Sequence, residues 1–144
     1  MSRPPPPIRS DYRHFLDIPT RWNDNDSYGH VNNAVYFYYI DTVVNCFLID
    51  KGLLDIKSGK MIGFAVDTGC KFFSSIEYPD MVHAGLRVTK LGNSSVTYDI
   101  GLFRNEESTA AAQGYFIHVY VDAETRRPVK ISDTMRGILK EISQ

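Results

Sequence analysis

Two carboxylates lie in a short polar segment that could carry out chemistry. Asp24 and Asp26 are followed by Gly29 and His30, and an apolar run begins a few residues later, at about Ala34. If that run is a helix, its first backbone N–H groups and the positive end of its dipole point back at the segment. A carboxylate can attack a carbonyl or activate water, and unpaired N–H groups can stabilise the oxyanion that forms. One segment thus supplies two complementary parts of a hydrolytic site.

Each of these residues also has a simpler interpretation. An Asp before a Gly commonly closes an Asx-turn, which is the alternative role for Asp26. Asp24 is expected to form a loop hydrogen bond or a salt bridge with Arg21 rather than to act on a substrate. Gly29 can be a simple turn glycine; alternatively it allows a positive φ or the close approach of a substrate to the backbone. His30 could act as a general base, although a structural or substrate-orienting role is favoured.

The segment needs a helix to position it, and the sequence predicts one over about Ala34 to Leu48. Nearly every residue in this run is apolar, and a length of about 15 residues favours a helix over a buried strand. A helix that is apolar on almost all sides is expected to be enclosed by the rest of the fold. Asn32 or Asn33 is a suitable N-cap, and Gly52 is a suitable C-cap.

Strand-like runs lie on both sides of this helix. His14 to Arg21 is expected as a first strand, and Pro19 favours an edge position or a strand end. Four runs that follow the helix alternate apolar and polar residues in places: Ile62 to Phe73, Met81 to Lys90, Ser95 to Arg104 and Ala110 to Val121. The segments that separate the four runs are too short for crossover helices, which favours antiparallel pairing.

A second helix, short and terminal, is expected over Asp133 to Ile142 with Ser132 or Asp133 as its cap. Together the elements predict an α+β fold in which a curved antiparallel sheet of about five strands wraps around one long central helix.

The composition limits the class of protein. At 144 residues and 16.4 kDa the chain fits a single domain of ordinary size. A formal charge of −1, from 16 basic and 17 acidic residues, argues against nucleic acid as a partner. The two cysteines, Cys46 and Cys70, have no spacing typical of a metal site and are expected to be reduced core thiols. His83 and His118 are expected to be satisfied or exposed strand residues without a metal role.

The first residues differ in character from the rest. Residues 1–11 contain four consecutive prolines, Pro4 to Pro7, and are expected to form a mobile or polyproline arm before one domain over residues 12–144. No apolar signal-peptide core is seen, and no apolar run is long enough to cross a bilayer. We therefore expect a cytoplasmic protein without a membrane partner.

The loop and the turns resemble a known family. An Asp followed by Gly-His-Val-Asn-Asn (residues 29–33) and an aromatic-rich helix is similar to the signature of hotdog-fold acyl-CoA thioesterases of the 4-hydroxybenzoyl-CoA thioesterase type. The turns Tyr78-Pro79-Asp80 and Leu91 to Val96, and the order of strand, long helix and several strands, extend the resemblance from about residue 13 to 131.

This resemblance implies a function and roles for particular residues. It implies hydrolysis of an acyl-CoA to free acid and CoA without a metal or organic cofactor, with Asp26 as nucleophile or general base. The backbone N–H of Asn33 would polarise the thioester oxygen, with Gly29 and His30 beside it. It also suggests CoA contacts from a turn whose residues are Lys90, Ser94 and Ser95.

Aromatic side chains near the helix start, Tyr28 and Tyr36 among them, could line an acyl pocket or simply fill the core. A single sheet of this kind leaves strand edges open, so a homodimer or homotetramer with sites at the subunit junction is expected.

Two other functions stay open at this point. The chain could be a non-catalytic acyl-CoA-binding hotdog module, which would bind its ligand without releasing thiol. It could also be a hotdog dehydratase or hydratase, which needs a catalytic His paired with a carboxylate near the helix and for which His30 is the candidate.

Overall fold

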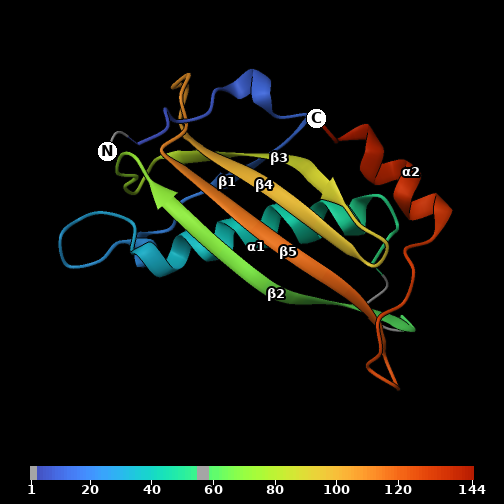
Figure 1. Ribbon diagram of the computed structural model, residues 1–144. Coiled ribbons are helices and arrows are strands. Elements are labelled where there is room, and N and C mark those ends of the chain that lie inside the picture. Colours follow the sequence, from blue (N-terminus) through green and yellow to red (C-terminus); the bar gives the residue numbers. More distant parts are fainter. Residues whose placement is uncertain (1–2, 55–58) are drawn as a thin grey trace.

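The computed structural model describes residues 3–54 and 59–144 and forms one sheet wrapped around one long helix (Figure 1). The elements in chain order are η1 (Arg9–Asp11), β1 (His14–Pro19), η2 (Trp22–Asp24), α1 (Asn33–Asp50), β2 (Met61–Phe72), β3 (Met81–Leu91), β4 (Ser95–Arg104), β5 (Ala112–Asp122) and α2 (Asp133–Glu141). The predicted α+β arrangement, with five strands, a long helix and a short terminal helix, is confirmed.

The sheet has the strand order β1-β3-β4-β5-β2, and every neighbouring pair is antiparallel. β1 and β2 are therefore the two edges, in agreement with the edge position that Pro19 predicted for the first strand. Alternation of side chains directs one set of residues on the strands toward α1, and this set forms the core with the helix. Val96, Tyr98, Ile100 and Leu102 of β4 belong to it, and each is fully buried.

Both helices begin at the caps that the sequence suggested. The side chain of Asn32 accepts a hydrogen bond from the backbone N–H of Ala34, and Ser132 does the same for Met135. At the other end of α1, Gly52 follows the C-cap with a φ of +69°, a conformation that glycine adopts without steric cost.

The prediction that α1 is enclosed on all sides is wrong for the single chain. One face is buried, through Tyr36, Tyr39, Ile40, Val43, Val44, Phe47 and Leu48. The opposite face is open, and Tyr38 keeps 68% of its surface exposed. Cys46, expected as a core thiol, is also exposed, whereas Cys70 is half-buried and burial raises its pKa to about 11. Apolar composition showed that the helix packs, but not which face the sheet leaves uncovered.

The proline-rich segment is described from residue 3 onward, and residues 1 and 2 lie outside the described part. Over the described part it differs from the mobile arm that was expected. The backbone N–H of Ala110 donates to the carbonyl of Pro7 at 2.9 Å, and Ile8 forms an isolated bridge with Thr109. The Arg9 side chain donates to the carbonyls of Glu107 and Asn105. A proline cannot donate a backbone hydrogen bond, but its carbonyl still accepts, and the Pro7 carbonyl together with the Arg9 side chain docks the segment on the domain.

Within residues 3–54 and 59–144, neither helix has the length and apolarity that crossing a bilayer requires.

Two glycines give a matched test of this packing. A Cβ added to Gly114 in β5 would lie 2.3 Å from Cδ1 of the buried Ile40 and 3.2 Å from the carbonyl oxygen of Gly69. We expect Gly114→Ala to lower the free energy of unfolding by about 1–3 kcal/mol, as overpacking does. Gly137 inside α2 has nothing within 4 Å of an added Cβ, so Gly137→Ala should raise stability by about 0.5–1 kcal/mol. Urea unfolding measures the free energy of unfolding of both variants. Equal changes in the two would contradict the close packing around Gly114.

Candidate active site

The loop before α1 is closed by Asp26. Its backbone N–H donates to the carbonyl of His30 at 2.8 Å, and its carbonyl accepts from Gly29 at 3.2 Å. Its side-chain Oδ1 accepts from the N–H of Tyr28 at 2.8 Å and from that of His30 at 3.5 Å. Gly29 has a φ of +81°, so the turn interpretation of this glycine applies. The Asx-turn foreseen as the simpler role of Asp26 is present, and it fixes the carboxylate in place.

The first turn of α1 presents an unpaired donor. The N–H of Ala34 is used by the Asn32 side chain and that of Val35 by the Asn32 carbonyl. The N–H of Asn33, the first helical residue, has no hydrogen-bond acceptor among the residues that the structure describes. It carries the partial positive charge of the helix start and is available to an oxygen of a bound molecule.

Asp26 and Asn33 line the same pocket, whose volume is about 420 Å³. His30 also lines it, and the opposite wall is the end of β2 and the residues that follow, Phe72, Phe73, Ser74 and Ser75. Tyr36 closes the inner side, where it is buried and its Oη accepts from the N–H of Ile76 at 3.3 Å. Burial raises the pKa of the Tyr36 hydroxyl, so this wall is neutral. Asp26 and Asn33, whose N–H has no acceptor in the described part of the chain, thus line one cavity.

Asp24, two residues before Asp26 in the chain, is in a different environment from Asp26. It is 1% exposed, and its carboxylate accepts from the backbone N–H of Arg21 at 2.9 Å and from the Tyr39 hydroxyl at 2.9 Å. The Arg21 guanidinium pairs with it at 2.9 Å, which confirms the predicted salt bridge. Burial raises the pKa of Asp24, but the hydrogen bonds from Arg21 and Tyr39 outweigh it and the net pKa is lowered. Asp24 therefore anchors the loop to α1.

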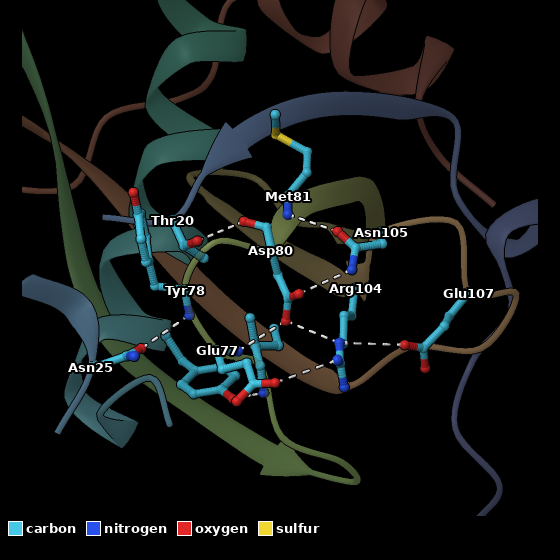
Figure 2. A network of polar contacts seen from close by, with 11 residues as sticks. Thr20, Asn25, Glu77, Tyr78, Asp80, Met81, Arg104, Asn105 and Glu107 are labelled. Carbon is cyan, nitrogen blue, oxygen red and sulfur yellow. Dashed lines mark hydrogen bonds and ion pairs between the residues drawn. The ribbon is translucent and has the colours of Figure 1, made fainter. Parts of the chain in front are cut away.

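A second anchor ties the loop to the sheet (Figure 2). The Asn25 side chain accepts from the N–H of Tyr78 at 3.1 Å, and the Thr20 hydroxyl donates to the carbonyl of Asp80 at 2.6 Å. The buried carboxylate of Asp80 pairs with Arg104 at 2.9 Å and accepts from Asn105 at 3.0 Å. The turn between β2 and β3 thus holds the segment that leads to Asp26 at Thr20 and at Asn25, as Figure 2 shows.

The structure does not bring every predicted site residue to this pocket. Tyr28 is 84% exposed at the tip of the loop and does not line it. Lys90 near the end of β3, Ser94 in the β3–β4 turn and Ser95 at the start of β4 lie together, and the Ser95 carbonyl accepts from Gly92 in this turn. This turn and the loop lie at opposite ends of the sheet (Figure 1). Lys90, Ser94 and Ser95 therefore cannot reach the Asp26 pocket of their own chain.

Ser74 and Ser75 are pocket residues that the sequence did not suggest. They follow the end of β2, and only the pairing of β2 with β5 and the turn to β3 bring them opposite the loop. No local pattern in the sequence carries that information.

The residues that the structure describes contain no group of three or more His, Cys, Asp or Glu side chains placed to hold a metal ion. Acid–base and hydrogen-bond chemistry are what the described pocket offers.

Residues 20–139 match the model of the Thioesterase-like superfamily, and the chain belongs to that family. The fold is the hotdog fold of its thioesterase neighbours. The PA5185 protein of Pseudomonas aeruginosa is 45% identical, with a TM-score of 0.94 over 97% of this chain and 98% of that chain. The PA2801 protein of the same organism, described as a candidate thioesterase, is 27% identical, with a TM-score of 0.81 over 86% of this chain and 95% of that chain.

A 1,4-dihydroxy-2-naphthoyl-CoA thioesterase from Synechocystis shares the fold at 16% identity, with a TM-score of 0.80 over 88% of this chain and 94% of that chain. The comparison with curated proteins returned no match. Family membership supports a thioesterase enzyme, that is, hydrolysis of a thioester in general.

Proposed function

We propose that this protein is an acyl-CoA thioesterase similar to the 4-hydroxybenzoyl-CoA thioesterase type, acting in the cytoplasm without a metal or organic cofactor. The observation that carries the proposal is that one pocket is lined by Asp26 and by Asn33, whose N–H is unpaired in the described part of the chain. A thioester carbonyl is electrophilic and its thiolate leaves readily, so a positioned carboxylate and one oxyanion donor suffice for hydrolysis.

The reaction uses these groups in a defined order. The carbonyl oxygen of the thioester accepts the Asn33 N–H, and Asp26 attacks the carbonyl carbon or takes a proton from a water that does so. The C–S bond breaks and CoA leaves as thiolate. In the first case water then hydrolyses the acyl–Asp26 anhydride; in both cases free acid and CoA result and Asp26 returns to the carboxylate form.

His30 lines the pocket but makes no ion pair with a carboxylate in the described part of the chain. The His–carboxylate pair of a dehydratase is therefore not supported, and we assign His30 to orienting the substrate.

We also propose that the enzyme works as a homodimer or a homotetramer. β2 is an edge strand of 12 residues with only β5 beside it, and Val66 at its irregularity is 58% exposed. Phe37 and Tyr38 on the uncovered face of α1 are exposed as well. A second copy would cover both. It would also bring its own Lys90, Ser94 and Ser95 within reach of the CoA phosphates of a substrate bound to the first copy.

A thiol-release screen tests the proposal directly. Acyl-CoA esters of increasing chain length and aromatic acyl-CoA esters are supplied, and free CoA is measured with a thiol reagent. We expect turnover with at least one class, and light scattering should give a particle mass of two or four times 16.4 kDa. Saturable acyl-CoA binding without thiol release would identify a non-catalytic binding module, and a change in enoyl absorbance with a hydroxyacyl-CoA would identify a hydratase.

A further inference from the structure

A second cavity lies at the other end of α1 from the Asp26 pocket. Its volume is about 230 Å³, and it is lined by residues that include Asn45, Leu48, Lys60, Gly63, His118 and Tyr120. β2 begins beside this cavity at Met61 and ends beside the first pocket at Phe72. An extended strand of that length places these two residues about 35 Å apart. The two cavities are therefore separate within one chain.

Two buried polar residues, His118 and Tyr120, line this second cavity, and a third, Tyr98, packs against the His118 ring. The Nδ1 of His118 has no hydrogen-bond partner in the part of the chain that the structure describes, and the hydroxyls of Tyr98 and Tyr120 have none beyond each other. Tyr98, His118 and Tyr120 are 0%, 5% and 4% exposed. The Tyr98 and Tyr120 rings both meet the His118 ring edge-on, with centroids 5.7 Å and 5.9 Å away. His118 was expected to be satisfied or exposed, and it is neither.

Such a group of unpartnered atoms is unusual in a core. Buried polar groups are nearly always hydrogen-bonded, and one that is not costs free energy that an apolar side chain of the same shape would avoid. Phe in place of Tyr120 would fill the same space without a hydroxyl. Polar atoms retained at the wall of a cavity indicate that they bind something there.

The chemistry of the cluster defines what could bind. Burial lowers the pKa of His118 to about 4 and raises that of Tyr120 to about 12; it also raises the pKa of Tyr98. All three are neutral near pH 7 and offer hydroxyl donors and an imidazole nitrogen. Leu48 and Met61 add apolar surface, and Lys60 is the one charged residue among those lining the described cavity. A cavity of roughly 150 Å³ already holds benzene, so a six-membered ring fits.

We propose that this second pocket binds a small neutral group with an aromatic body and one hydroxyl or carbonyl, held by His118 and Tyr120. The group could belong to a free small molecule or to the acyl part of a thioester. The latter source rests on the proposed thioesterase function: two copies paired through antiparallel β2 edges would set the second pocket of one beside the Asp26 pocket of the other.

Phenol and benzene are the probes, because they differ only by the hydroxyl. We expect calorimetry to show saturable phenol binding at least tenfold tighter than benzene binding. Tyr120→Phe should weaken phenol binding at least fivefold and leave benzene binding unchanged, since the variant keeps the shape of the pocket. Tyr115→Phe is the matched control, because Tyr115 is an exposed β5 residue whose hydroxyl donates to Asp67.

The two sources are separated by enzyme kinetics. Competitive inhibition of thiol release by phenol assigns the pocket to the acyl group, and undisturbed thiol release assigns it to a separate ligand; either supports the site. Equal affinity for phenol and benzene, no saturable binding, or a crystal of the phenol-soaked protein with only ordered water on His118 and Tyr120 would overturn it. The calorimetric and crystallographic results do not require that the protein be a thioesterase, so the two proposals fail independently.

Discussion

Asp26→Asn is expected to lower kcat for acyl-CoA hydrolysis by a factor on the order of 10² or more and to leave the thermal unfolding temperature unchanged. The loop depends on Oδ1 of Asp26, which accepts from the N–H groups of Tyr28 and His30. The amide oxygen of Asn accepts the same two hydrogen bonds, so the loop keeps its shape. The amide has no negative charge and neither attacks a carbonyl nor takes a proton from water. Thiol-release kinetics and thermal melts measure the two effects.

Two further variants separate chemistry from loop structure. Asp26→Ala removes both the carboxylate and the loop acceptor, so kcat and the unfolding temperature should both fall. Asp133→Asn is the matched control, because Asp133 lies at the start of α2, away from the pocket, and the same change there should leave kcat unaltered. Wild-type turnover in Asp26→Asn would show that another residue performs the chemistry.

Asp24→Ala is expected to reduce the free energy of unfolding by about 3 kcal/mol. The buried Asp24 carboxylate accepts from the backbone of Arg21 and from the Tyr39 hydroxyl, and removing it leaves that hydroxyl in the core without an acceptor. The Arg21 side chain is 70% exposed, so its share of the ion pair is screened by solvent and small. Tyr39→Phe removes the other partner and should cost about 1 kcal/mol. Urea unfolding measures both, and an Asp24→Ala loss below that of Tyr39→Phe would contradict the anchoring role.

The effect of Asp24 should depend on pH with a definite sign. Its folded-state pKa lies below the ordinary value of 3.8, so the folded state holds its proton less tightly than the unfolded state. The stabilisation is therefore fully present above about pH 4 and is lost as the pH falls through the lowered folded-state pKa. The difference in stability between wild type and Asp24→Ala should shrink from pH 5 to pH 2. A difference constant over that range would exclude a charged Asp24 as the anchor.

Local patterns in the sequence predicted the helices and strands, a helix cap and an ion pair of the loop. Asn32 as a cap, the alternation along β4 and the Arg21–Asp24 pair depend on neighbours in the chain, and the structure contains all three. Asp26 fits both roles considered for it, because one carboxylate oxygen closes the loop while the residue lines the pocket. Closing the loop and facing the cavity are compatible, and the sequence offered no reason to expect both.

Features that depend on distant packing could not be predicted. The strand order carries Ser74 and Ser75 to the loop and sends Lys90 to the far end of the sheet. The uncovered face of α1 depends on how far the sheet curves, which no run of residues records. His118 looked like an ordinary strand residue because it fits the alternation of residues along β5. Only the tertiary structure shows that its Nδ1 is buried without a hydrogen-bond partner in the described part of the chain.

The arrangement of Asp26 and Asn33 around a thioester is tested most directly by a crystal structure with a CoA ketone, in which a CH₂ group replaces the reacting sulfur and prevents hydrolysis. We predict the ketone oxygen about 2.7–3.1 Å from the Asn33 backbone nitrogen, with the Asp26 carboxylate, or one water bound to it, facing the carbonyl carbon. A ketone bound elsewhere, or one whose oxygen faces away from the start of α1, would contradict this site.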